Sequence, residues 1–371
     1  MKRTIIISLI SILTAAGATA QVADGYYRIQ NNASQRYITV RDDQVGEIDY
    51  SSTNADLSNI VTWRGFDYVK SNPASIIYVQ KVGTRYNFKV QGTSIYEISG
   101  NRRYLDVLAR DGGTYIFAIT YNGTEYHLYD SNNDDDEGYV NNKKTEAAYQ
   151  YWKFVAIDTN NSYIGLQPTV QVGDSYYGTL YASYPFKVAS SGITVYYVDG
   201  VKEGVFQLKE ITDDVKPAAT PLLFKCSSNN PSQNKITPVT DSTTSPDDNQ
   251  MGGTYFARTS GHKVNVKYDA TTMRVLGKNE AGELAFITGT AENLTSKKYI
   301  PANTCWLNVP SGLTGDFKYV SRDEYTGIQT VKASEAATLK GTFTLTGQRQ
   351  QEGASLRPGI YIRDGKKVII K

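Results

Sequence analysis

The sequence has few of the residue types on which enzyme active sites usually depend. Its 371 residues include two histidines, His127 and His262, and two cysteines. A Ser-His-Asp or Cys-His centre would have to use one of those histidines. The sequence also lacks the H-E-x-x-H, C-x-x-C, G-x-S-x-G and phosphate-loop motifs that identify common catalytic sites. We therefore predict a non-enzymatic protein with no cofactor and no metal site.

The chain also lacks an excess of charge of one sign and, beyond its start, any long apolar run. It has 39 Lys and Arg residues against 37 Asp and Glu residues, a formal net charge of +2. Proteins that bind nucleic acid or an anionic membrane surface usually show a strong excess of basic residues. We therefore predict no nucleic-acid partner, and no transmembrane segment in the mature chain.

The first residues have the pattern of a secretory signal peptide. Lys2 and Arg3 precede a short apolar run at residues 4–13, and Ala18-Thr19-Ala20 supplies small residues for cleavage. A retained membrane anchor is the alternative, but the run is shorter than the ~20 apolar residues that a spanning helix needs. The pattern predicts a signal peptide at residues 1–20 and a mature protein that is secreted or held at the cell surface.

Aromatic and β-branched residues are prominent in the remainder, which includes all 29 tyrosines. Tyr, Thr, Val and Ile suit a pleated, half-exposed surface, so the composition predicts an all-β protein. An exported chain can hold disulfides. Cys226 and Cys305 either form one or stay as two buried thiols, because spacing in sequence does not reveal the Cβ separation that the bond requires.

A short strand pattern recurs within residues 21–157. Residues 36–40, Arg-Tyr-Ile-Thr-Val, have a near-copy at residues 103–107 and a looser one at residues 138–141. Copies of one strand-turn-strand unit that cannot bury their apolar faces alone must share a core. We predict a three-part β domain whose large aromatic residues meet at a common axis, namely Tyr27, Trp63, Phe117 and Trp152.

A tripeptide near the end of this region carries a family resemblance. Gln150-Tyr151-Trp152 fits the Q-x-W signature that closes a repeat in ricin-type β-trefoil domains. Residues 25–31, Gly-Tyr-Tyr-Arg-Ile-Gln-Asn, look like the first hairpin of such domains in secreted bacterial proteins. Residues 21–157 therefore resemble a lectin-like β-trefoil domain. The resemblance implies structural roles for Gln150 and Trp152, with the amide fixing a turn and the indole filling the core.

The same resemblance implies a carbohydrate site. In the family, a loop Asp, an aromatic residue and an Asn of one repeat contact the sugar; here the third unit offers Asp130, Tyr139 and Asn141. An aromatic face packs on sugar C–H groups while carboxylate and amide groups bind the hydroxyls. Tyr139 has a second interpretation as the strand tyrosine of its repeat, equivalent to Tyr37 and Tyr104.

The most acidic run of the chain, residues 130–138, begins within this candidate site. Asp130, Asn132 and Asp134 are spaced like the first ligands of a calcium loop. However, Asp135 stands where the helix-loop-helix motif needs glycine, and no bidentate acid occupies the twelfth position. We interpret the run as a solvated loop.

Residues 158–318 show a different pattern of loops and short strands. Residues 216–223 resemble residues 300–307, and both read as a loop that leads into a buried strand. Asp199-Gly200 has the composition of a hairpin turn. Because no long helical run occurs, we predict a β-sandwich or jelly-roll-like domain.

The C-terminal region divides into a linker and a tail. Residues 319–340 are polar and lack a clear period, which predicts a linker. Residues 341–371 contain three short strand patterns separated by glycine turns. Their G-Q-R, G-I-Y and G-K-K elements resemble the C-terminal tail of exported bacterial proteins, which implies a sorting or anchoring signal. The alternative is a small β element packed on the second domain.

These features together predict an all-β chain with an N-terminal β-trefoil, a β-sandwich or jelly-roll-like domain and a short C-terminal β tail. The trefoil resemblance implies a non-enzymatic binding protein that recognises glycan or surface polysaccharide. Two alternatives stay open. One is a structural or adhesive surface protein that binds a protein partner through strand edges. The other is a glycan hydrolase, because two loop carboxylates are enough for that chemistry.

Overall fold

The chain folds almost entirely into β-strands. The computed structural model describes residues 21–40, 61–94, 104–131, 137–144, 148–256, 266–295, 298–326, 341–345, 347–351, 356–363 and 366–370. Within these ranges the α-helical residues are those of α1 at Phe66–Val69 and residues 322–326. The all-β prediction is confirmed. The predicted signal peptide, His262 and residues 132–136 of the acidic run lie outside the described residues.

The first unit is a sheet that closes on itself. Its eleven strands are β1 (Gly25–Asn31), β2 (Tyr37–Val40), β3 (Val61–Arg64), β4 (Ile77–Val82), β5 (Arg85–Val90), β6 (Thr93–Ser94), β7 (Tyr104–Arg110), β8 (Thr114–Tyr121), β9 (Thr124–Asp130), β10 (Glu137–Lys143) and β11 (Trp152–Ala156). Pairings run from β1 through β4, β5, β7, β8 and β11 and back to β1. Closure gives these six strands neighbours on both sides, which removes exposed edges.

Aromatic side chains fill the interior of this ring. Phe154 contacts Tyr27, Phe88 and Phe117 at ring-centroid distances of 5.5, 5.8 and 5.4 Å. Trp152 stacks on Phe117 with centroids 6.0 Å apart, and both side chains are fully buried. Aromatic pairs add about 0.5–1.5 kcal/mol each beyond the area they bury. Side chains from β1, β5, β8 and β11 therefore stabilise the unit through one shared cluster.

The second unit contains two sheets. The smaller has β12 (Ile164–Gly165), β15 (Phe186–Val188), β18 (Val215–Lys216) and β20 (Lys235–Pro238). The larger has β13 (Val170–Val172), β14 (Ser175–Leu180), β16 (Ile193–Lys202), β17 (Val205–Glu210), β19 (Leu222–Cys226), β21 (Met251–Thr254), β22 (Met273–Lys278), β23 (Leu284–Ile287), β24 (Thr304–Asn308) and β25 (Phe317–Tyr319). Among its core residues, Phe206 and Phe286 pack at 5.0 Å.

The hairpin turn predicted at Asp199-Gly200 lies elsewhere. Those residues belong to β16, where the register with β17 shifts between Val198 and Gly200. The turn follows at Glu203-Gly204, and Gly204 has the positive φ of +69° that favours glycine. The glycine at position 200 serves close packing instead, because a Cβ there would lie 2.8 Å from Gln207 and from Tyr325.

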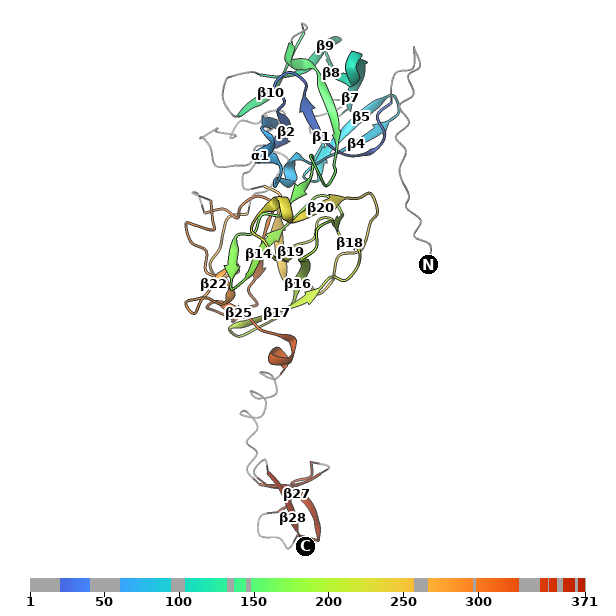
Figure 1. Cartoon of the computed structure of the whole chain (residues 1–371). Helices are drawn as coiled ribbons and strands as arrows, with labels where there is room; N and C mark the ends of the chain where they lie inside the picture. The colour runs from blue at the N-terminus through green and yellow to red at the C-terminus, as the bar shows by residue number, and fades with distance from the viewer. Residues whose placement is uncertain are drawn as a thin grey trace.

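The two units pack against each other along a seam (Figure 1). Ile76 of the first unit belongs to the same buried cluster as Ile164 and Leu166 of the second. Conversely, Phe256 of the second unit belongs to the core cluster of the first. A Cβ added at Gly92 would lie 3.2 Å from the ring of Tyr255. The units therefore share hydrophobic clusters on both sides of the junction.

A buried arginine also joins them. The guanidinium of Arg28, on β1, donates to the carbonyl oxygens of Ser162 at 2.8 Å and Val69 at 3.1 Å. Its Nε donates to Ser75 Oγ at 3.3 Å, and its Cζ lies 5.5 Å from the centre of the Phe66 ring. Burial lowers the pKa of Arg28 to about 10, so the group stays charged at neutral pH. Its partners are neutral acceptors, which indicates a structural cation.

A separate three-stranded sheet ends the chain. It contains β26 (Thr342–Thr344), β27 (Gly359–Arg363) and β28 (Lys366–Ile370), and Figure 1 shows it apart from the two units. Residues 319–326, placed in the linker by the sequence pattern, instead pack on the second unit, where Val320 and Tyr325 are buried. Among the residues described, no helix has the length and hydrophobicity needed to span a bilayer.

Candidate functional site

The antiparallel pair β9 and β10 has one buried side and one accessible side. Cross-strand partners are Asp130 with Val140 and Tyr129 with Asn141. Leu128, Asp130 and Val140 are buried, whereas Asn141 is exposed and Tyr129 half-buried. Successive residues of a strand point to opposite sides. The accessible side, here called the β9–β10 face, therefore carries Glu125, His127, Tyr129, Asn141 and Lys143.

Polar groups on the β9–β10 face are already oriented by their neighbours. Glu125 Oε1 lies 2.8 Å from His127 Nε2. The ammonium of Lys143 lies 4.8 Å from the centre of the Tyr129 ring, within range of a cation–π contact. Asn141 Oδ1 accepts a hydrogen bond from the backbone N–H of Asn142 at 2.8 Å. The face thus combines an aromatic ring, an amide and a carboxylate–imidazole pair on one strand pair.

Asp130 lies on the other side of the sheet. It is fully buried, and its Oδ2 accepts a hydrogen bond from Ser34 Oγ. Its Oδ1 is buried without a protein partner. Burial raises the pKa of the Asp130 carboxyl, and the hydrogen bond from Ser34 and the charge of Arg36 oppose that shift. The structure therefore separates Asp130 from Asn141, so these two predicted sugar contacts do not converge.

Two other predicted residues lie on paired strands, with side chains outside the described residues. The backbone of Tyr139 pairs with Thr62 of β3. The backbone of Trp63 pairs with Ile38 of β2 and with Gly138 of β10. Both residues therefore belong to the portion of the sheet where β2, β3 and β10 are neighbours.

The Q-x-W residues lie beneath the β9–β10 pair. Gln150 ends the short helical turn at Ala148–Gln150 and is fully buried, with no protein hydrogen bond to its amide. Trp152 Nε1 donates to the Leu128 carbonyl at 3.1 Å, which ties β11 to β9. Asn31 Nδ2 donates to the Tyr149 carbonyl at 2.7 Å. These contacts hold the inner side of the strand pair and leave its outer side accessible.

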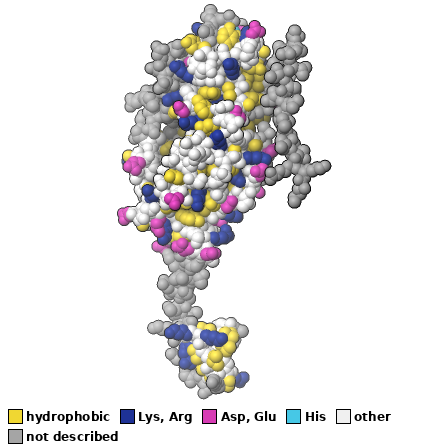
Figure 2. Space-filling view, in the orientation of Figure 1, with side chains coloured by type: hydrophobic (Ala, Val, Ile, Leu, Met, Phe, Trp, Pro, Cys, Tyr) yellow, Lys and Arg dark blue, Asp and Glu magenta, His cyan; other side chains and the backbone are white. Residues whose placement is uncertain are grey.

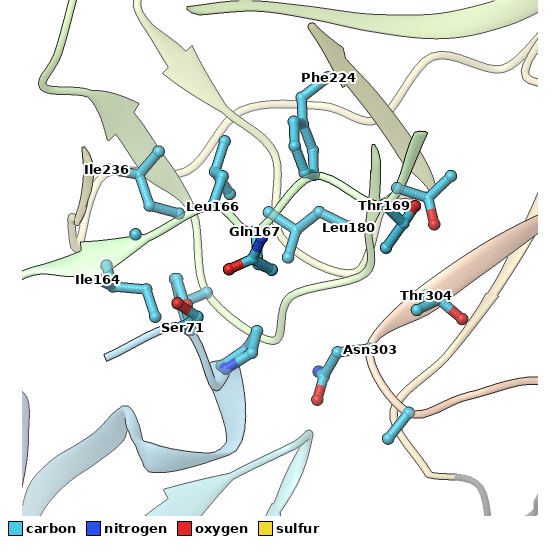
Figure 3. A pocket seen from close by; sticks show the side chains of 15 residues that line it. Ser71, Ile164, Leu166, Gln167, Thr169, Leu180, Phe224, Ile236, Asn303 and Thr304 are labelled. Carbon is cyan, nitrogen blue, oxygen red and sulfur yellow. The ribbon is translucent and has the colours of Figure 1, made fainter. Parts of the chain in front are cut away.

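A cavity of about 150 Å³ lies at the seam between the units (Figure 3). Its walls come from several stretches of the chain that lie far apart in the sequence. The lining residues are Ser71, Pro73, Ile164, Gly165, Leu166, Gln167, Thr169, Thr179, Leu180, Tyr184, Phe224, Ile236, Ala302, Asn303 and Thr304. None of these residues carries a charge.

The two cysteines are free and buried. Cys305 Sγ lies 3.2 Å from the Leu180 carbonyl oxygen and 3.7 Å from that of Leu222, at the start of β19. Cys226 ends the same strand, four residues later and therefore ~13 Å away at the rise of a β-strand. A disulfide needs Cα atoms within about 7 Å. Burial raises the pKa of each thiol to about 12, so neither is poised as a nucleophile.

Charged side chains form neither a dominant patch on the face of the two units that Figure 2 shows nor a metal centre in the part of the chain that the structure describes. Figure 2 shows side chains of both signs scattered over the visible face of the two units. Among the described residues, no group of three or more His, Cys, Asp and Glu side chains could hold a metal ion.

Comparison with known proteins assigns no family to the chain. No family model matches it, and no curated protein matches it. The case for the β9–β10 face as a functional site therefore rests on the residues of this chain alone. Sequence reasoning had missed Glu125, His127 and Tyr129 as one set. Their alternation with the buried Leu128 was the signal that could have identified them.

Proposed function

We propose that the mature chain is a secreted or cell-surface carbohydrate-binding protein without enzymatic activity, and that glycan binds at the β9–β10 face. The observation that carries this proposal is the register that places Tyr129 directly across from the exposed Asn141. A phenol ring can pack on the C–H groups of a sugar ring, while the neighbouring amide and the Glu125 carboxylate bind hydroxyls. Asn141 keeps its proposed role as a sugar contact.

We further propose that the first unit is a β-trefoil. The closed circuit of strand pairings and the burial of Trp152 beside Phe117 support this proposal. Asp130 then acts in support of the site, because its bond to Ser34 holds the β1–β2 turn against β9. Tyr139 remains a candidate contact through its position on β10. The two sheets of the second unit support a sandwich-like arrangement for that domain.

The same proposal includes export of the chain and its retention at the cell surface. The charged start, short apolar run and small residues at 18–20 support a cleaved signal peptide. The independent sheet at residues 341–370 supports a sorting or anchoring role for the tail, because it pairs with no other described strand.

One observation favours a protein partner as a second candidate. In the tail sheet, Ile360 pairs with Ile369, and their side chains are 38% and 63% exposed. Figure 2 shows hydrophobic side chains gathered on this small sheet beside Lys and Arg. An exposed apolar strand pair of this kind suits contact with another protein.

A glycan array probed with the full mature chain tests the leading proposal. For any glycan retained, Tyr129→Ala and Asn141→Ala should each weaken binding at least about tenfold, since each removes a direct contact worth ~1.4 kcal/mol or more. Asn142→Ala is the matched control, because Asn142 is exposed and adjacent but lies off the face. An array on which nothing binds, or binding that survives both substitutions, would refute the assignment.

A further inference from the structure

The tail sheet has one covered side and one open side. Along β27, Tyr361 is buried whereas Ile360 is exposed. The same alternation continues in β28, where the exposed Ile369 stands between the half-buried Val368 and Ile370. Residues that lie directly opposite each other on two paired strands point to the same side. The pairing of Ile360 with Ile369 therefore places both isoleucines on the open side.

A row of four side chains crosses the open side of the sheet. Phe343 of β26 pairs with Ile362 of β27, and Ile362 pairs with Lys367 of β28. At the other edge, Phe343 forms an isolated bridge with Arg349. A Cβ placed at Gly341 would lie 3.2 Å from Arg349 Nε and 3.7 Å from the Phe343 ring, so these two side chains lie on one side. The order across the sheet is therefore cation, aromatic, aliphatic, cation.

Apolar side chains occupy the space between the two cations. Ile360 and Ile369 form a second row next to the first, and Figure 2 shows hydrophobic side chains gathered on this sheet beside Lys and Arg. The open side, here called the tail face, consists of Phe343, Arg349, Ile360, Ile362, Lys367 and Ile369. Apolar side chains that gather on the surface within a polar rim mark sites of contact with a protein or a membrane.

The tail also carries a positive charge that the rest of the chain does not have. Residues 341–371 contain six Lys and Arg residues and two Asp and Glu residues, a net charge of +4. The whole chain has a net charge of +2, which leaves −2 for residues 1–340. The nearly balanced total therefore conceals a basic segment, and such segments are attracted to anionic partners.

Apolar side chains flanked by cations suit the surface of a bilayer. The apolar groups enter the boundary of the acyl chains, while the long cationic side chains reach anionic headgroups. Lys367 argues against a protein contact, because lysine is depleted in protein–protein interfaces. We propose that the tail face binds the surface of a membrane that contains anionic lipid. The inference rests on the anchoring role proposed for the tail and names the partner for that role.

Flotation of the full mature chain with lipid vesicles tests the proposal. The probes are vesicles of phosphatidylcholine and phosphatidylglycerol in equal parts, with vesicles of phosphatidylcholine alone as the comparison. The chain should bind the mixed vesicles at least about tenfold more tightly, since each cation near an anionic surface contributes about 1 kcal/mol. Added salt should weaken this binding. A chain that ends at residue 326 keeps both units and should bind neither kind of vesicle.

Three results would overturn the proposal. The first is that the full chain does not bind the mixed vesicles. The second is that it binds both kinds of vesicle equally well, because the cations of the tail face would then have no part in binding. The third is that the chain that ends at residue 326 binds as well as the full chain.

An apolar substitution locates the binding. Ile369→Ser removes an exposed apolar side chain from the tail face and should weaken binding to the mixed vesicles about tenfold. Val82→Ser is the matched control, because Val82 is an exposed β-branched residue at the end of β4 in the first unit. It should leave binding unchanged. Equal effects of the two substitutions would contradict the assignment to the tail face.

A second pair of substitutions tests the charge. Lys367→Gln should weaken binding to the mixed vesicles about fivefold, the effect of losing ~1 kcal/mol. Lys366→Gln is the control, because Lys366 is equally exposed but points to the covered side of β28. Its effect should be smaller, and an equal effect would show that the orientation of the tail face does not matter.

Retention on the cells that export the chain separates this inference from the anchoring role. If the chain that ends at residue 326 stays on the cell surface, the tail is not the anchor, and the anchoring role is wrong. If that chain is released while the full chain is retained but does not bind the mixed vesicles, the tail is held by another partner, such as a protein. That second result refutes only the binding of lipid.

Discussion

The side-chain amides of Gln91 and Asn303 exchange two hydrogen bonds across the seam. Gln91 Nε2 donates to Asn303 Oδ1 at 2.7 Å, and Asn303 Nδ2 donates back to Gln91 Oε1 at 2.9 Å. Both residues are buried, and both have positive φ, +51° and +57°. A reciprocal amide pair satisfies the donors and acceptors that face each other, so it joins the two units without a charge.

This pairing predicts strong coupling between the two positions. Gln91→Ala or Asn303→Ala alone should lower the free energy of unfolding by about 1–3 kcal/mol, because each leaves the buried amide oxygen of the other residue without its donor. In the double variant the loss should be smaller than the sum, with a coupling energy of about 1–2 kcal/mol. Urea unfolding of the wild type, the two single variants and the double variant measures this coupling energy. Additive effects would show that the amides do not act as a pair.

Arg28 should be among the most sensitive positions of the chain. Arg28→Met removes the buried hydrogen bonds to the Ser162 and Val69 carbonyls and to Ser75 Oγ, so the free energy of unfolding should fall by about 3 kcal/mol. Arg322→Met is the control, because its guanidinium is 68% exposed and lies 3.4 Å from Asp199; it should cost less than about 1 kcal/mol. Chemical denaturation of the two variants measures both changes in the free energy of unfolding. Similar losses in the two would contradict the structural role of Arg28.

Stability should depend on the pH through Asp130. Its pKa is raised in the folded state, so the unfolded chain ionises first as the pH rises past the ordinary value of 3.8. Between the unfolded pKa and the higher folded pKa, the unfolded state releases its proton while the folded state keeps it. The free energy of unfolding therefore falls as the pH rises from the first value to the second. Asp130→Asn should remove this fall. The free energy of unfolding of the wild type and of Asp130→Asn, measured at several pH values, tests this. Parallel pH dependences of the two proteins would disprove the effect.

The thiols should be inaccessible in the native protein. Cys226 and Cys305 are buried, and Cys305 of β24 lies beside Leu222, at the end of β19 opposite Cys226. The two thiols are too far apart to pair, so a disulfide-exchange reagent should titrate no thiol until denaturant is added, and then two. A reducing agent should leave the Tm unchanged, because no disulfide constrains the chain. A Tm that falls on reduction would contradict the free-thiol state.

The all-β class could be predicted because it depends on local preferences. The tyrosines and β-branched residues alternate with polar ones along single strands. The position of Asp130 could not be predicted in the same way. Which side of the sheet it occupies relative to Asn141 depends on the register of β9 and β10, and a shift by one residue would reverse that side.

The seam was beyond prediction for a different reason. Gln91 and Asn303 are 212 residues apart in sequence. Gln91 lies in no motif, and the pattern shared by residues 216–223 and 300–307 does not identify a partner for Asn303. The same applies to Arg28, which the sequence pattern presents as one polar residue of a surface strand. Its burial depends on packing between units that a pattern within one unit does not describe.

The hydrogen bonds between Arg28 and the second unit limit where the protein can be divided into stable fragments. A fragment that stops at residue 157, where the sequence repeats end, would omit Ser162 and leave the guanidinium short of one carbonyl. It would also uncover Ile76, which packs among side chains contributed by residues beyond that point. Expression of the first unit by itself should therefore yield an unstable product, whereas a cut at the tail removes none of these contacts.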